Sequence, residues 1–332
     1  MNHGRILTRA WTMLWHYRVL WVFGFLFALA GGGGGSQFMR GGGGNGAGGS
    51  GSGTGRPGPF PSFPLQSINW NTVALIAGAV VAVVLLLTVV TLVIRYMSET
   101  ALMASADEIE STGAALSVRQ GFRLGWSRQA WRLFLTDLVI YLPITLAALA
   151  LLAAGATPLL LWLTRQVPLG IMGTVLTVAL ELLVILLLIA LGLVLSVVMP
   201  FLRRRVVLAR QGPLAALRQS ARLVRASLLD TGLMWLLLAA IRIVWSLLSF
   251  PIFILLLVLA GVVGGVPALA AYLLSHSWVW PVVVGVPLFL LMLVPSFAFV
   301  EGLFEAYVSA SWTLTYRDVA NRFGDQLTAQ PA

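Results

Sequence analysis

Long apolar stretches alternate with short polar segments along the whole chain. Six stretches hold about 20 or more predominantly apolar residues, the length that a helix needs to cross roughly 30 Å of hydrocarbon. They lie at residues 14–33, 73–94, 131–152, 171–199, 231–262 and 281–300. The pattern predicts an all-α polytopic membrane protein with about six transmembrane helices. The fifth stretch is too long for a straight crossing, and Pro251 within it predicts a broken or strongly tilted helix.

Arginines are concentrated in every second polar segment. Residues 1–18, 95–132, 203–225 and 317–322 hold three, five, seven and two of them, whereas the intervening loops hold only three. Basic residues in short loops stay on the cytoplasmic side of a membrane. We therefore expect a multi-pass protein of a bacterial-type inner (cytoplasmic) membrane, with its N-terminus and its C-terminus both in the cytoplasm.

A cleaved signal peptide is an alternative interpretation of the N-terminus. Arg5 and Arg9 would form its basic start, and Ala-Leu-Ala at 28–30 would form its cleavage site. Trp11 and Trp15 favour a retained segment, because tryptophan is typical of membrane interfaces. The mass of the purified protein distinguishes the two interpretations.

Residues 31–64 form a low-complexity segment with two glycine runs followed by four closely spaced prolines. Such a segment buries too little apolar surface to offset the entropy lost on ordering. We expect a disordered extracytoplasmic loop there. The six stretches and their connections use nearly all of the remaining length, so residues 1–332 are expected to form a single transmembrane domain.

Basic patterns at helical spacing precede the pairs of apolar stretches. Arg119 and Arg123 in the second arginine-rich segment, and Arg218, Arg222 and Arg225 in the third, lie opposite apolar positions. The spacing predicts three parallel repeats of one amphipathic helix and one two-span hairpin. Such helices lie in the inner-leaflet interface with their apolar sides in the lipid and their guanidiniums toward anionic head groups. The alternative is that these arginines only determine topology.

Ionisable residues also fall within or at the edges of the apolar stretches. Counting residues along the helices places Glu181 and Arg242 near the membrane midplane, where an unpaired charge is expensive. We therefore hypothesise that Glu181 and Arg242 form an intramembrane charge pair, acting either as a latch between helices or as part of a transport path. Asp137, Glu301 and Glu305 lie nearer the interfaces and are expected to reach water.

Composition excludes several classes of protein. Only 10% of the residues are charged and 59% are hydrophobic, whereas soluble domains have about 25% charged residues. The net charge of +10 comes from arginines that flank apolar stretches, which does not indicate nucleic-acid binding. Without cysteine, with three scattered histidines and with no nucleophile or phosphate-loop motif, the sequence predicts no enzyme, no metal site and no cofactor.

Three sequence segments resemble a known group of membrane proteins. They are Leu-Trp-Val-Phe-Gly at 20–24, Ala-Leu-Met-Ala-Ser-Ala at 101–106 and Ala-Leu-Arg-Gln-Ser-Ala-Arg-Leu-Val-Arg at 216–225. Together they are similar to uncharacterised bacterial multi-pass proteins related to the membrane domain associated with glycerophosphoryl diester phosphodiesterases. The catalytic barrel of those enzymes is absent here, so the resemblance implies a multi-pass fold and no activity.

These observations favour an integral membrane protein without catalytic activity, which organises lipids or partner proteins through its cytoplasmic helices. Its expected partners are anionic lipids of the inner leaflet. The alternative is a transporter of a small solute, an ion or a lipid, whose path uses Glu181 and Arg242.

Overall fold

The computed structural model describes residues 2–31, 70–113, 116–164, 166–209 and 212–328. Every regular element in these ranges is helical, as predicted. The elements are α1 (His3–His16), α2 (Val19–Leu29), α4 (Trp70–Thr112), α5 (Val118–Gly125), α6 (Arg128–Gly155), the short 3₁₀ helix η2 (Thr157–Thr164), α7 (Val167–Leu208), α8 (Pro213–Ala226), α9 (Leu228–Ser275) and α10 (Val279–Thr328). The predicted glycine-rich loop lies almost entirely outside the described residues, so its disorder stays a prediction.

Five helical segments are long and apolar enough to cross a membrane, and a bent pair of helices raises the number to six. The prediction of a polytopic helical membrane protein is therefore confirmed. The first stretch is not one straight helix, however, because α1 and α2 meet at 96°. Tyr17 is extended at this bend, and the indole of Trp21 donates a hydrogen bond of 2.8 Å to the carbonyl of Leu14.

The long helices continue well beyond their apolar stretches. Helix α4 runs to Thr112, and α10 runs far past residue 300, so much of each predicted cytoplasmic connection is helical. Helix α9 also continues through Pro251, so the helix is not broken there, and the alternative of a strong tilt stays a prediction. A proline removes one backbone hydrogen bond and can bend a helix without ending it, because membrane helices tolerate that loss.

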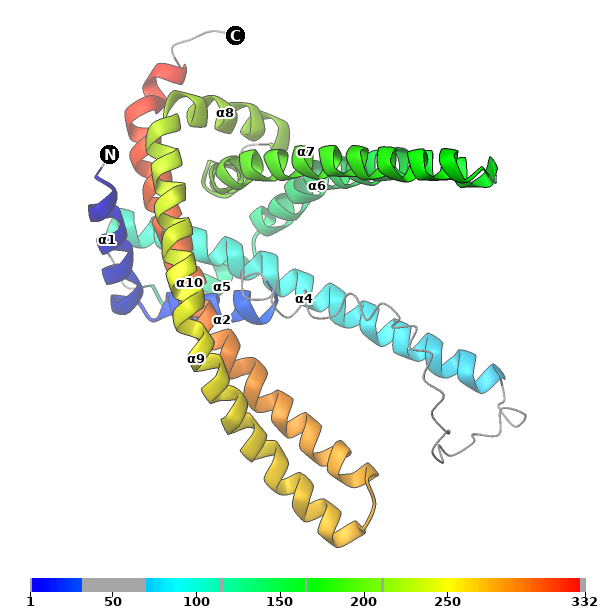
Figure 1. The fold of residues 1–332 in the computed structure, drawn as a ribbon. Helices are drawn as coiled ribbons and strands as arrows, with labels where there is room; N and C mark the ends of the chain where they lie inside the picture. The colour runs from blue at the N-terminus through cyan, green and yellow to red at the C-terminus, as the bar shows by residue number, and fades with distance from the viewer. Residues whose placement is uncertain (1, 32–69, 114–115, 165, 210–211, 329–332) are drawn as a thin grey trace.

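The inner parts of the helices pack together into a region that we call the hub. It comprises α1, α2, α5, α8 and the adjoining parts of the long helices, at residues 95–112, 199–208, 228–242 and 301–322. Its main apolar core joins side chains of α1, α2, α4, α7, α8, α9 and α10. In Figure 1, α4, the α6–α7 pair and the α9–α10 pair diverge from this region. We call these diverging parts the arms.

The order of elements repeats three times along the chain. A short helix, α1, α5 or α8, is followed each time by a pair of apolar helices. Local capping explains where two of the short helices begin: the Asn2 side chain accepts from the Arg5 amide, and Ser117 and Gln120 form a reciprocal capping box. The predicted unit of one short helix and two long apolar helices is therefore present at α5–α6–α7 and at α8–α9–α10. In the first unit α2 has 11 residues, too few to cross a membrane alone, so a third two-span hairpin stays a prediction.

Glycines allow the first and last parts of the hub to touch. A Cβ atom on Gly24 of α2 would lie 2.2 Å from the carbonyl oxygen of Gly302 of α10, and a Cβ on Gly302 would meet the Gly24 backbone at 2.6 Å. Only residues without side chains let two helix backbones approach this closely. This crossing places α2, with its fully buried Leu20 and Phe23, against α10.

Candidate functional site

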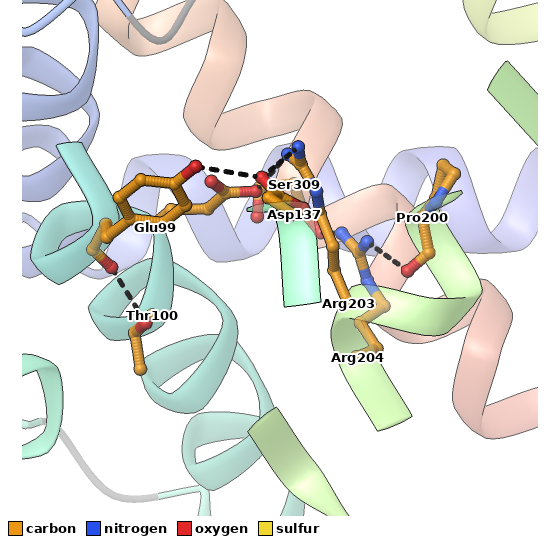
Figure 2. Close-up of polar contacts among 8 residues, drawn as sticks. Glu99, Thr100, Asp137, Pro200, Arg203, Arg204 and Ser309 are labelled. Carbon is orange, nitrogen blue, oxygen red and sulfur yellow. Dashed lines mark hydrogen bonds and ion pairs between the residues drawn. The ribbon is translucent and has the colours of Figure 1, made fainter. Parts of the chain in front are cut away.

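Charged side chains from three helices meet at the edge of the hub. Arg203 of α7 contacts Glu99 of α4 through Nη1 at 2.6 Å and Asp137 of α6 through Nη2 at 2.8 Å. The hydroxyl of Tyr96 donates a further hydrogen bond of 3.2 Å to Asp137. One planar guanidinium therefore holds two carboxylates from two different helices, a geometry that lysine cannot reproduce. Figure 2 shows Arg203 reaching toward Asp137.

The neighbouring Arg204 joins α7 to α10 and is only 3% exposed. Its Nε donates to the Thr313 hydroxyl at 3.2 Å, its Nη2 to the Ser309 carbonyl at 2.8 Å and its Nη1 to the Pro200 carbonyl at 2.8 Å. All three acceptors are neutral. No carboxylate in the described parts of the chain lies within 4.0 Å of this guanidinium. Figure 2 shows Arg204 beside Arg203 and directed toward Pro200.

Arg242 of α9 pairs with Glu305 of α10 at 2.7 Å, and not with Glu181. The predicted Glu181–Arg242 pair is therefore wrong. The Glu181 carboxylate lies beside Gly155 of α6, the neighbouring helix in its own hairpin. Counting residues predicts the depth of each charge but not the direction in which its side chain points. Arg242 points toward α10 and Glu181 toward α6, each the other helix of the same hairpin. Arg242 also lies over the Phe304 ring, 5.7 Å from its centroid.

These charges surround a cavity of about 250 Å³ between α4, α6, α7, α9 and α10. Its polar lining includes Glu99, Arg203, Arg204, Arg242 and Glu305. Its apolar lining includes Phe27, Leu102, Met199 and Trp312. Among the lining residues, Tyr141, Ser196 and Arg242 are exposed and mark its mouth, whereas Leu102, Met199 and Arg204 are buried.

The arginines predicted to contact lipids are exposed on the short helices. They are Arg119, Arg123, Arg218, Arg222 and Arg225, and none has a carboxylate within 4.0 Å in the described ranges. The opposite side of α8, at Ala216, Ser220 and Leu223, is buried. Ala216 and Leu223 pack in the apolar clusters of the protein. Close van der Waals packing, and not removal from lipid, favours this side of the helix on protein.

The sequence interpretation missed Glu99, Arg203 and Arg204 as site residues. It assigned them to cytoplasmic connections and treated the arginines as topology signals. Other topology arginines also make ties between helices, since Arg9 contacts Glu110 at 2.8 Å and Arg317 contacts Asp107 at 3.0 Å. One available signal was that Glu99, Arg203 and Arg204 come within five residues of the end of an apolar stretch. A helix that continues past that end places them in the hub. No group of three or more metal-binding side chains is assembled within the described residues.

A family model described as a family of unknown function (DUF7544) matches residues 7–324. This range is nearly the whole chain, so the chain belongs to that family. No curated protein and no solved structure matches it. The resemblance to the membrane domain associated with glycerophosphoryl diester phosphodiesterases stays a prediction, because the family match does not bear on it.

Proposed function

We propose that this member of the DUF7544 family is a non-catalytic membrane scaffold that gathers anionic lipids of the inner leaflet around its hub. The observation that carries the proposal is the two-sided arrangement of α8. Arg218, Arg222 and Arg225 are exposed, while Leu223 and Val224 between them are buried in the main core. Because the helix is held by protein, its arginines keep a defined place at the rim of the hub.

The orientation of the protein is part of this proposal. Of the 21 basic residues, 17 lie in the four arginine-rich segments, and most of those that the structure describes fall in the hub. A hub on the cytoplasmic side of a bacterial-type inner membrane agrees with the retention of basic residues there. Each exposed arginine near an anionic surface contributes about 1 kcal/mol of attraction. Three arginines on α8 therefore provide a measurable preference for anionic lipid.

Charge reversal of α8 tests the scaffold role. The triple variant R218E/R222E/R225E in nanodiscs is expected to lose most of its preference for spin-labelled phosphatidylglycerol over phosphatidylcholine. The matched control R218K/R222K/R225K keeps the charges and should keep the preference. An unchanged lipid preference in the glutamate variant, with an unchanged unfolding transition, would contradict the proposal.

Transport is a second candidate function, favoured by the charged cavity that reaches Arg242. The path would then use Arg242 and Glu305, since Glu181 is not among the residues that line this cavity. In proteoliposomes, solute or lipid movement should fall in R242Q and E305Q and persist in E181Q. Equal losses in all three variants would contradict a path through this cavity.

A further inference from the structure

Arg204 has hydrogen-bond donors that the surrounding protein does not use. A guanidinium carries five N–H groups, and three of those of Arg204 are bonded to Thr313, Pro200 and Ser309. One N–H on each terminal nitrogen remains, on a side chain that is almost fully buried and lines the cavity. Buried donors are normally satisfied, so these two N–H groups require an acceptor inside the cavity. A guanidinium with a remaining N–H on each terminal nitrogen can donate to two oxygens of a phosphate or a carboxylate.

Three arginines and two glutamates line the cavity, and Asp137 behind Arg203 supplies a third carboxylate. Arg203 is held by Glu99 and by Asp137, which does not itself line the cavity, and Arg242 is held by Glu305. Of these three guanidiniums, Arg204 alone has no carboxylate of the described residues within 4.0 Å. Glu99 also lines the cavity, and its Oε2 is buried without a hydrogen-bond partner among the described residues. An occupant that satisfies both groups carries an anionic group and a hydrogen-bond donor.

The depth of the cavity indicates which anion meets it. Glu99, Arg204 and Glu305 each lie five residues beyond the inner end of an apolar stretch, which is about 7.5 Å along a helix. The head-group layer adds roughly 5–8 Å to each side of the hydrocarbon core. The three side chains therefore lie at the level of the inner-leaflet phosphates. The mouth of the cavity, at the exposed Tyr141 and Ser196, opens on the α6–α7 arm.

The size and walls of the cavity limit the occupant further. Its volume of about 250 Å³ lies below the range of about 300–1,000 Å³ that is typical of sites for drug-sized ligands. A head group fits this volume, whereas two acyl chains do not. Phe27, Met199 and Trp312 give the cavity apolar walls around the charged groups. Such walls suit the junction between a head group and its chains.

We infer that this cavity binds one phosphate group whose remaining part carries a hydrogen-bond donor. Arg204 would hold the phosphate oxygens and Glu99 Oε2 would accept from the donor. The same chemistry is offered by the phosphodiester of an inner-leaflet glycerophospholipid with a glycerol or ethanolamine head group, and by free phosphate. This inference shares with the proposed function the cytoplasmic orientation of the hub, but it involves none of the exposed arginines of α8.

Binding of short-chain lipids to the purified full-length protein tests the inference. We expect saturable 1:1 binding of dioctanoyl phosphatidylglycerol and phosphatidylethanolamine, measured by native mass spectrometry and calorimetry. Phosphatidylcholine, whose head group has no donor, should bind about tenfold more weakly, because Glu99 would be left unsatisfied. R204Q should weaken binding about tenfold or more, since it removes a charge-assisted fork. S196W should block the mouth, and S196A is its matched control.

The outcomes separate the possible sources and the two proposals. Inorganic phosphate that binds saturably, and is lost in R204Q and S196W, would support the site with free phosphate as its ligand. The α8 variant R218E/R222E/R225E should bind the short-chain lipids as the wild type does, even if the scaffold role fails. Ser196 is exposed, so S196W leaves a readable test if R204Q does not fold.

Absence of saturable binding by the wild type, or wild-type affinity in S196W and in folded R204Q, would overturn the inference. Equal affinity for phosphatidylcholine would overturn the role of Glu99.

Discussion

The hub and the arms are made from the same long helices but differ in what surrounds their side chains. In the hub, Leu102 of α4 is 1% exposed, whereas in the arms Leu186 of α7 is 64% exposed. Lipid chains are as apolar as leucine, so apolar side chains gain little by leaving lipid for protein. Close packing and polar contacts therefore decide where membrane helices associate, and both are concentrated in the hub. The comparison indicates that stability resides in the hub and that the arms mainly meet the bilayer.

The largest expected effect comes from breaking the charge cluster of the hub. R203L would leave the buried Glu99 and Asp137 without their shared partner, and losing one member of a buried pair costs about 3–5 kcal/mol. Unfolding in mixed micelles, followed by tryptophan fluorescence, measures the free energy of unfolding. R218L, at an exposed position on α8, is the control and should change that free energy little. Similar losses in both variants would contradict the concentration of stability in the hub.

A matched pair of leucine truncations compares the two regions directly. L102A removes a buried side chain of the hub and should cost about 2–5 kcal/mol of the free energy of unfolding. L186A removes an exposed side chain of an arm and should change it by no more than about 0.5 kcal/mol. The same unfolding assay reads both variants. A large loss in L186A would show that the arm packs against protein, such as a second copy, in the membrane.

Adding one methyl group at the crossing of α2 and α10 tests the same comparison of hub and arms. G302A would push a Cβ into the Gly24 backbone, and overpacking of this kind costs about 1–3 kcal/mol. G192A in the arm part of α7 is the control, because nothing lies within 4 Å of the position of its Cβ. It should be neutral or stabilising, since alanine is the better helix former. A lower unfolding midpoint for G192A than for G302A would contradict the assignment of close packing to the hub.

The smallest expected effect concerns Arg242 and Glu305 at the margin of the hub. The Arg242 side chain is 46% exposed, so its pair with Glu305 should couple by no more than about 1 kcal/mol. A double-mutant cycle of R242Q and E305Q measures this coupling energy. The cycle of R242Q with E181Q should give a coupling near zero. A larger coupling to Glu181 than to Glu305 would restore the pair predicted from the sequence.

Sequence patterns predicted the parts of the fold that depend on hydrophobic length and charge order. The apolar stretches mark helices that could span a membrane, and basic segments precede each pair of them as the short helices do in the structure. The bend at Tyr17 was not predictable, because it falls inside residues 14–33, which form one continuous apolar stretch of suitable length. Its cause is tertiary, since α2 turns to pack on Gly302.

The candidate site was less predictable than the fold. Arg203 and Arg204 are adjacent in sequence, yet one binds two carboxylates and the other binds three neutral oxygens. Nothing in their local sequence separates these roles, which depend on whether α4, α6 or α10 lies opposite. The same limit explains Arg242, whose depth was readable from the sequence while its facing helix was not. The depth of a charge follows from counting residues along one helix. Predicting its partner also requires the rotation of two helices about their own axes.

The contact between Gly24 and Gly302 also bears on the order of events during synthesis. The two residues are separated by 278 positions, and a ribosome that adds about 5–20 residues per second needs on the order of 15–60 s to make that length. During this interval α2 has been made but its partner surface on α10 does not yet exist. The nascent chain must keep Leu20 and Phe23 sheltered in lipid or by a chaperone until the last helix arrives. Final closure of the hub is thus a step that follows synthesis of this part of α10.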